Sequence, residues 1–107
     1  MAEDRTGQVA VIFVSERTLD DDAGYAEAAG QMARLAATQP GYRGAEDARG
    51  EDRIGITVSY WADEASAIAW RRHPDHAAIR EAGRGRWYRW YRLHVAQIDR
   101  SYSWQRG

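Results

Sequence analysis

The fold is decided by residues 53–80, RIGITVSYWADEASAIAWRRHPDHAAIR, which join a strand pattern to a helix pattern. The first part alternates large apolar side chains with small or polar ones, the period-two pattern of a β-strand. Its apolar positions are Ile54, Ile56, Val58 and Tyr60. Asp63 is suited to cap a helix that continues to residue 71 or 72, and Pro74 suits the first position of a second helical segment. The stretch therefore predicts a strand followed by a helix in two pieces.

The composition indicates one globular domain spanning residues 1–107. Hydrophobic residues make up 44% of the chain, and its fifteen arginines are balanced by sixteen acids, so the net charge of -1 gives no reason to expect nucleic acid. The absence of cysteine excludes disulfides, thiolate metal sites and a cysteine nucleophile. No apolar run approaches the roughly 18 residues of a membrane span. The polar start MAEDRTGQ lacks a secretory signal, so we expect a cytoplasmic protein with residues 1–7 flexible.

The remaining segments complete a βαββαβ order. Residues 9–14, VAVIFV, predict a strand that is buried on both faces, and Thr18 with Asp21 forms a capping box for the helix that follows. A weaker strand over residues 42–49 predicts a hairpin with residues 53–61, and the final strand is expected at about residues 92–100. This order predicts a ferredoxin-like α+β fold, a four-stranded antiparallel sheet with helices on one face. A second copy of the sheet would cover the other apolar face, so we expect a homodimer.

Four segments resemble the antibiotic biosynthesis monooxygenase family: VAVIFVSERT, PGYRGAEDARG, ITVSYWADEASAIAWRRHPDH and WYRLHVAQIDRSYSW. The most specific part is the strand that ends at Trp61, followed by an acid, a helix with Trp70, and HPDH. The resemblance implies a dimeric α+β barrel. It does not select one activity, since the family contains cofactor-independent oxygenases of phenolic and quinol aromatics, haem-degrading enzymes, and many members without a known substrate.

The haem-degrading branch resembles this chain at one of its three functional positions. Trp70 falls where that branch has the tryptophan that crowds the haem. The branch has an asparagine near the end of the first strand, where this chain has Glu16, and an axial histidine where this chain has Arg80. A guanidinium stays protonated and cannot ligate iron. We therefore expect no cofactor, with haem binding through His76 as the alternative.

Three residues are candidates for the chemistry. His76 has a pKa near neutrality and could accept the proton of a phenol, although a histidine packed against a helix edge is the simpler interpretation. Arg80 follows it by one helical turn and could bind the resulting anion, or it could belong to a solvated charge stripe. Glu16 is expected on the face of the first strand that looks toward the helices, where burial would make it a base. His73 and His76 flank Pro74-Asp75, but we expect no metal there.

Tryptophans are the candidate walls of an aromatic pocket. We expect Trp70 above all to contact the substrate, and the other candidates are Trp61, Trp87, Ile12 and Val14. Tryptophans at helical spacing can also belong simply to the core. The leading hypothesis is a cofactor-independent monooxygenase that oxidises a small phenolic or quinol-type aromatic with O2. The alternatives are a haem-binding or haem-degrading monooxygenase and a non-catalytic dimer that binds a ligand.

Overall fold

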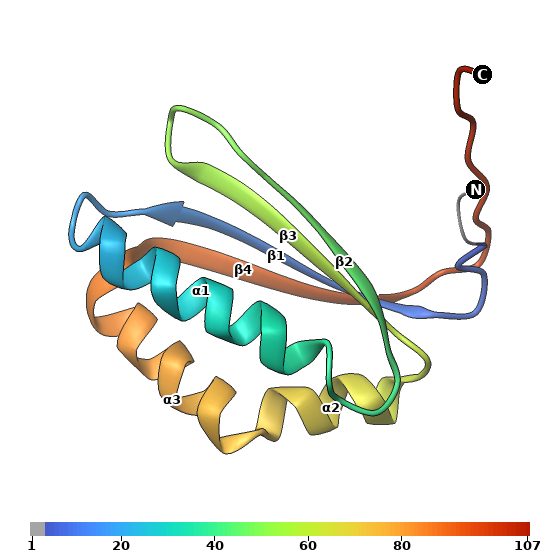
Figure 1. The fold of residues 1–107 in the computed structure, drawn as a ribbon, viewed down its shortest axis with the longest axis horizontal. Helices are drawn as coiled ribbons and strands as arrows, with labels where there is room; N and C mark the ends of the chain where they lie inside the picture. Colours follow the sequence, from blue (N-terminus) through green and yellow to red (C-terminus); the bar gives the residue numbers. More distant parts are fainter. Residues whose placement is uncertain (1–3) are drawn as a thin grey trace.

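The computed structural model describes residues 4–107, and these form one antiparallel sheet with helices on one side (Figure 1). The elements in chain order are β1 (Val9–Arg17), α1 (Asp22–Ala36), β2 (Tyr42–Arg49), β3 (Ile54–Trp61), α2 (Glu64–Arg72), α3 (Pro74–Ala82), the π-helical turn η1 (Gly83–Trp87) and β4 (Tyr88–Gln97). The strand order is β2-β3-β1-β4. The predicted ferredoxin-like α+β fold is confirmed, including the second helix in two pieces.

Several boundaries differ from the sequence-based prediction, since β1 continues to Arg17 rather than residue 14 and β4 ends at Gln97 rather than near residue 100. The last strand begins at Tyr88 rather than near residue 92, because a π-helical turn connects it directly to α3. The residue that caps α1 is Asp21, which adopts a left-handed backbone conformation (φ 56°) and accepts from the Gly24 N–H at 3.1 Å. Thr18 instead donates its hydroxyl to the Arg86 carbonyl at 2.8 Å. It therefore joins the end of β1 to η1 rather than starting the helix.

The core lies between the helices and one end of the sheet. Its buried members are Val9, Ala36, Trp61, Ala67 and Trp70, and partly buried side chains of α1 and β2 pack against them. Trp61 is fully buried, and its indole N–H donates to the Ser59 hydroxyl at 2.9 Å. This end of the molecule therefore holds β1, β3, α1 and α2 together.

The two faces of β1 are the reverse of what was expected. Val9 belongs to the core beneath the helices, and Phe13 contacts the helix-facing Tyr88. Because side chains alternate along a strand, Ile12, Val14 and Glu16 lie on the face turned away from the helices. Both faces of this strand are apolar, so periodicity alone could not tell which one the helices cover. The prediction that Glu16 looks toward the helices is wrong.

The chain just before β1 is attached to the sheet. The Gly7 N–H donates to the Ile98 carbonyl at 2.8 Å, and the Arg5 guanidinium lies 3.9 Å from the centre of the Tyr60 ring. Residues 1–3 of the segment that was expected to be flexible lie outside the described residues. Among the residues that are described, no helix is long and apolar enough to cross a membrane.

Candidate active site

Three aromatic rings stack at the point where α2 meets α3. The Trp61 and Trp70 rings are 6.1 Å apart at 24°, and the His76 ring lies 4.4 Å from Trp70 at 16°. Asp63 caps α2 by accepting from the Ser66 N–H at 2.8 Å, which fixes the start of the helix that carries Trp70. Pro74 begins α3, so His76 falls in the first turn of that helix. The break at residues 73–74 thus folds the histidine back onto the tryptophan.

His76 is held neutral and in one tautomer. Its Nδ1 lies 3.0 Å from the Trp70 carbonyl oxygen, and because a carbonyl only accepts, Nδ1 carries the proton and Nε2 is left as an acceptor. Burial is the largest cause that lowers the pKa of His76, and the positive charges of Arg80, Arg71 and His73 lower it further, against the opposing effect of the Trp70 carbonyl. Near pH 7 the ring is therefore a neutral base.

Arg80 lies one helical turn after His76, half-buried, and reaches back toward α2. Its Nη1 donates to the Arg71 carbonyl at 3.2 Å, satisfying an acceptor at the C-terminal end of that helix. Its Nε is buried and has no hydrogen-bond partner among the described residues. The guanidinium therefore links the two helices and places a positive charge beside the histidine.

A shallow groove of about 400 Å³ runs between α1 and α3 next to this stack. It is lined by Gln31, Met32, Leu35, Asp75, Ala78 and Ile79. Met32 and Leu35 also pack against the core cluster that contains Trp70. Neither His76 nor Trp70 lines the groove, but two of its lining residues therefore join it to the core around Trp70.

Several predicted site residues lie elsewhere. Glu16 accepts from the Trp90 indole at 3.1 Å and pairs with the Arg89 Nε at 2.7 Å, on the sheet face opposite the helices. Ile12 and Val14 share that face, so none of these three lines the helix-side interior. Trp87 is buried in η1 near the C-terminal end of β1, whereas Trp70 packs near its N-terminal end. Those ends are roughly 26 Å apart along the strand, given about 3.3 Å per residue.

His73 has a structural role at the start of α3. Its Nδ1 accepts from the Asp75 N–H at 3.2 Å and so caps the helix. Among residues 4–107, no three histidine and acidic side chains come close enough together to hold a metal ion. The two histidines thus have different roles: His73 caps α3, and His76 packs on Trp70.

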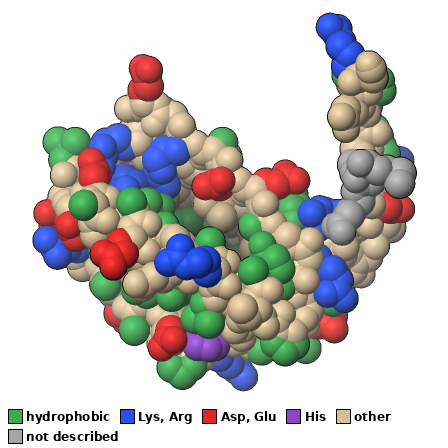
Figure 2. Space-filling view, in the orientation of Figure 1, with side chains coloured by type: hydrophobic (Ala, Val, Ile, Leu, Met, Phe, Trp, Pro, Cys, Tyr) green, Lys and Arg blue, Asp and Glu red, His purple; other side chains and the backbone are tan. Residues whose placement is uncertain are grey.

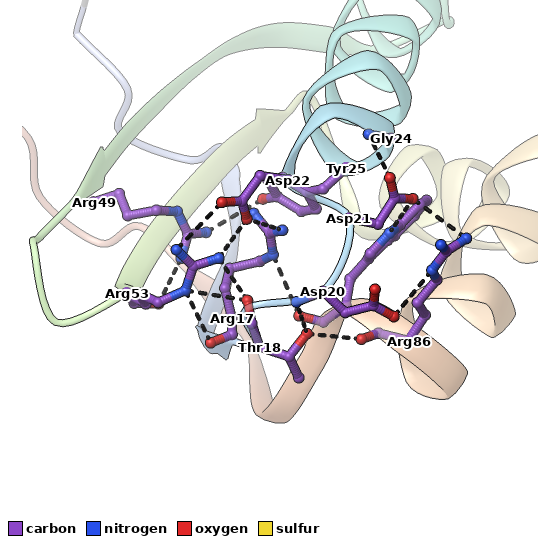
Figure 3. A network of polar contacts seen from close by, with 11 residues as sticks. Arg17, Thr18, Asp20, Asp21, Asp22, Gly24, Tyr25, Arg49, Arg53 and Arg86 are labelled. Atoms are coloured by element: carbon purple, nitrogen blue, oxygen red, sulfur yellow. Dashed lines mark hydrogen bonds and ion pairs between the residues drawn. The ribbon is translucent and has the colours of Figure 1, made fainter.

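Sequence reasoning missed a second group of residues at the far end of the helix-facing side. Phe13 lies 5.3 Å from both Tyr88 and Tyr91, and Tyr25 of α1 packs edge-on against Tyr88 at 6.0 Å. Arginines surround these rings, and Figure 3 shows how Arg17 and its neighbours meet at the start of α1. The signal available in the sequence was WYRWY at residues 87–91, which we assigned to a helix and the approach to the strand.

Comparison with known proteins gives the family. Residues 9–82 match the family model described as antibiotic biosynthesis monooxygenase, which is more than half of the chain. This chain belongs to the antibiotic biosynthesis monooxygenase family. A relative from Bacillus subtilis (strain 168), the uncharacterized protein YqjZ, is 46% identical over 96 residues, covering 90% of this chain and 83% of that protein.

Solved structures share the fold at low sequence identity. SnoaB, described as a cofactor-independent oxygenase from Streptomyces nogalater, superposes with a TM-score of 0.75 at 14% identity and covers 90% of this chain and 97% of its own. Rv0793 from Mycobacterium tuberculosis gives a TM-score of 0.76 at 15% identity, with 89% and 99% covered. At these identities the likeness shows the fold of the family.

Proposed function

We propose that this member of the antibiotic biosynthesis monooxygenase family is a cofactor-independent monooxygenase that oxidises a small phenolic or quinol-type aromatic with O2. One observation carries the proposal: the half-buried, neutral His76 ring lies flat on Trp70. The Trp70 carbonyl oxygen fixes the orientation of the ring and leaves Nε2 as the free nitrogen. A neutral base against an aromatic wall is what deprotonation of a phenol requires. The likeness to SnoaB, described as a cofactor-independent oxygenase, supports the same reaction class.

The reaction needs only the substrate and O2. His76 Nε2 takes the phenol proton, and the phenolate passes one electron to O2, which gives a phenoxyl radical and superoxide. The two combine at a ring carbon to form a peroxide anion, which takes back the proton held on His76 and becomes a hydroperoxide. Loss of water from this hydroperoxide leaves a quinone. One oxygen atom of O2 enters the product and the other leaves as water. The protein supplies the base, the positive charge of Arg80 close to the anion, and a fixed geometry at Trp70.

Haem fits this arrangement poorly. Arg80 occupies the position at which the resemblance to the haem-degrading branch implies the axial histidine, and its guanidinium cannot ligate iron. His76 packs against Trp70 with ring centres only 4.4 Å apart, which leaves no space for a porphyrin between the two rings. We expect haem titration to give no sharp Soret band that saturates at one haem per chain. Such a band, lost in His76→Ala, would favour the haem-binding alternative.

We also propose that the protein is a homodimer. The face of the sheet turned away from the helices carries Ile12, Val14, Ile54 and Ile56, and the last two are 36% and 46% exposed. An extended apolar face of this kind is rarely left in water by a soluble monomer. A second copy of the same sheet, related by a two-fold axis, would cover it.

Oxygen consumption tests the proposal with metal-free and haem-free protein and a panel of phenols and naphthols. His76→Ala should lower turnover by roughly 10²–10⁴-fold, the usual contribution of a positioned base, while binding changes little. His73→Ala is the matched control, because it removes a neighbouring imidazole whose observed role is helix capping. Unchanged turnover in His76→Ala would refute the assigned base. No oxygen uptake with any member of the panel would favour the non-catalytic ligand-binding dimer.

A further inference from the structure

A cluster of basic and phenolic side chains lies beneath the start of α1, away from the Trp70–His76 pair. We call it the arginine–tyrosine cluster and define it by Arg17, Tyr25, Arg49, Tyr88 and Ser15 (Figure 3 shows the first three). The members come from β1, α1, β2 and β4. Four elements that are separate in sequence therefore contribute to a single small region.

Arg49 reaches this region only because β3 has a glycine beside it. A Cβ added to Gly55 would lie 2.6 Å from the Arg49 Cζ, so the guanidinium crosses directly over the glycine. It donates to the Arg53 carbonyl at 2.8 Å and to the Tyr25 hydroxyl at 3.2 Å. Gly55 pairs in register with Ser15 of β1. The Arg49 guanidinium is therefore carried from the sheet edge toward β1.

Three arginines meet near the start of α1, and they differ in their carboxylate partners. Arg17 is only 5% exposed, lies 3.5 Å over the Tyr25 ring and pairs with Asp22 at 3.0 Å. The same Asp22 carboxylate also pairs with Arg53. Arg49 has no carboxylate partner among the described residues. Asp22 thus pairs with two of these three arginines, and the exposed Arg49 guanidinium is left without a carboxylate in the described part of the chain.

Ser15 adds an independent observation. Its side chain is fully buried, and its Oγ has no hydrogen-bond partner among the described residues. An orphaned buried hydroxyl costs free energy and is rare in folded proteins, so it calls for a partner that the chain itself does not supply. The side chain stands on the helix-facing side of β1, between Gly55 and Tyr91 in register.

Aromatic rings adjoin the cluster. Phe13 lies two residues before Ser15 on the same face of β1. The centre of its ring is 5.3 Å from that of Tyr88 and 5.3 Å from that of Tyr91. Thr57 pairs in register with Phe13 and is exposed although it faces the helix side. Figure 2 shows that the surface is hollowed between the β2–β3 hairpin and α1, with arginine side chains beside the hollow. A flat ligand could thus reach these rings from solvent.

We propose that the arginine–tyrosine cluster binds the carboxylate of a small aromatic acid, with Arg49 and Ser15 contacting the carboxylate and Phe13 and Tyr91 contacting the ring. A guanidinium recognises a carboxylate with two parallel hydrogen bonds, and the ligand would supply the carboxylate that Arg49 lacks among the described residues. Burial raises the pKa of the Tyr88 hydroxyl, so this group stays protonated and remains able to donate.

Isothermal titration calorimetry with benzoate tests the proposal, and benzyl alcohol is the neutral control of similar shape. Benzoate should bind at one site per chain. Benzyl alcohol should bind with an affinity at least 10-fold lower. Arg49→Gln should weaken benzoate binding on the order of 10-fold or more, and Ser15→Ala by several-fold. Arg34→Gln removes the same charge from an exposed position of α1 and should leave binding unchanged. This measurement needs no turnover, so it stands or falls independently of the proposed oxygenase activity.

Two results would overturn the assignment. Equal binding of benzoate and benzyl alcohol would show that no carboxylate is recognised, and equal losses in the two arginine variants would show only a general charge effect. Gly55→Ala provides a second test if Arg49→Gln is poorly folded, because it displaces the guanidinium and keeps its charge. Benzoate affinity that is unchanged in a folded Gly55→Ala variant contradicts the proposed geometry.

Discussion

Removing the Trp70 side chain should both destabilise the protein and raise the pKa of His76. Trp70 is only 9% exposed and packs against Trp61 on one side and His76 on the other. Truncation of a buried tryptophan to alanine costs about 3–5 kcal/mol, because the cavity that remains is only partly refilled. The free energy of unfolding of native proteins is about 5–15 kcal/mol in total, so Trp70→Ala should still fold but with much lower stability.

The effect on His76 follows from the cause of its shift. Burial is the largest contribution that lowers this pKa, and the Trp70 ring stacks on the His76 ring at 4.4 Å, which covers one of its faces. The hydrogen bond from Nδ1 goes to the backbone carbonyl of Trp70, which survives the substitution. Once water reaches the ring, its pKa should rise toward the ordinary value of 6.5.

Two measurements check this prediction. Urea unfolding gives the loss of stability, and an NMR titration of the histidine ring protons gives the pKa in the folded variant. Trp104→Ala is the control, since Trp104 is 81% exposed and its removal should change both quantities little. A Trp70→Ala protein in which the His76 pKa is unchanged would refute the view that the stack keeps this histidine neutral.

Three further predictions concern pH, assembly and capping. Because the pKa of His76 is lowered on folding, the unfolded chain binds the ring proton more tightly than the folded chain does. The free energy of unfolding from urea titrations of wild type should therefore fall as the pH drops below about 6.5, until the pH passes the folded-state pKa. The same decrease should be much smaller in His76→Gln. Ile56→Glu should convert a dimer into monomers in sedimentation velocity, whereas Thr57→Glu, on the other face of β3, should not. Asp63→Ala should cost about 1 kcal/mol in urea unfolding through loss of the α2 cap, and no change would contradict the capping contact.

The architecture could be predicted because its signals are local. Asp63 and Pro74 mark two helix starts by their own chemistry, and both starts are where the sequence places them. The alternation in residues 54–61 predicts the strand that precedes both helices. The resemblance to the family then identified Trp70, and the structure packs it in the core against His76.

The site was harder to predict because its positions depend on the three-dimensional arrangement. Glu16 was assigned to the wrong side, since a strand that is apolar on both faces gives no sign of which face the helices cover. The approach of Arg49 to Ser15 depends on the missing side chain of Gly55 on the strand between them, which no spacing rule reveals. Likewise, the π-helical turn that begins at Gly83 brings Tyr88 into the sheet earlier than expected.

Isotope labelling tests the central claim, oxygenation without a cofactor, most directly. Metal-free and haem-free protein is given ¹⁸O2 and whichever phenol of the panel supports oxygen uptake, and the product is reduced at once to the hydroquinone so that its oxygens do not exchange with water. Mass spectrometry should show one ¹⁸O atom per product molecule from wild type, and far less labelled product from His76→Ala. Product without label, product with two labelled atoms, or turnover that appears only after iron or haem is added would contradict the account.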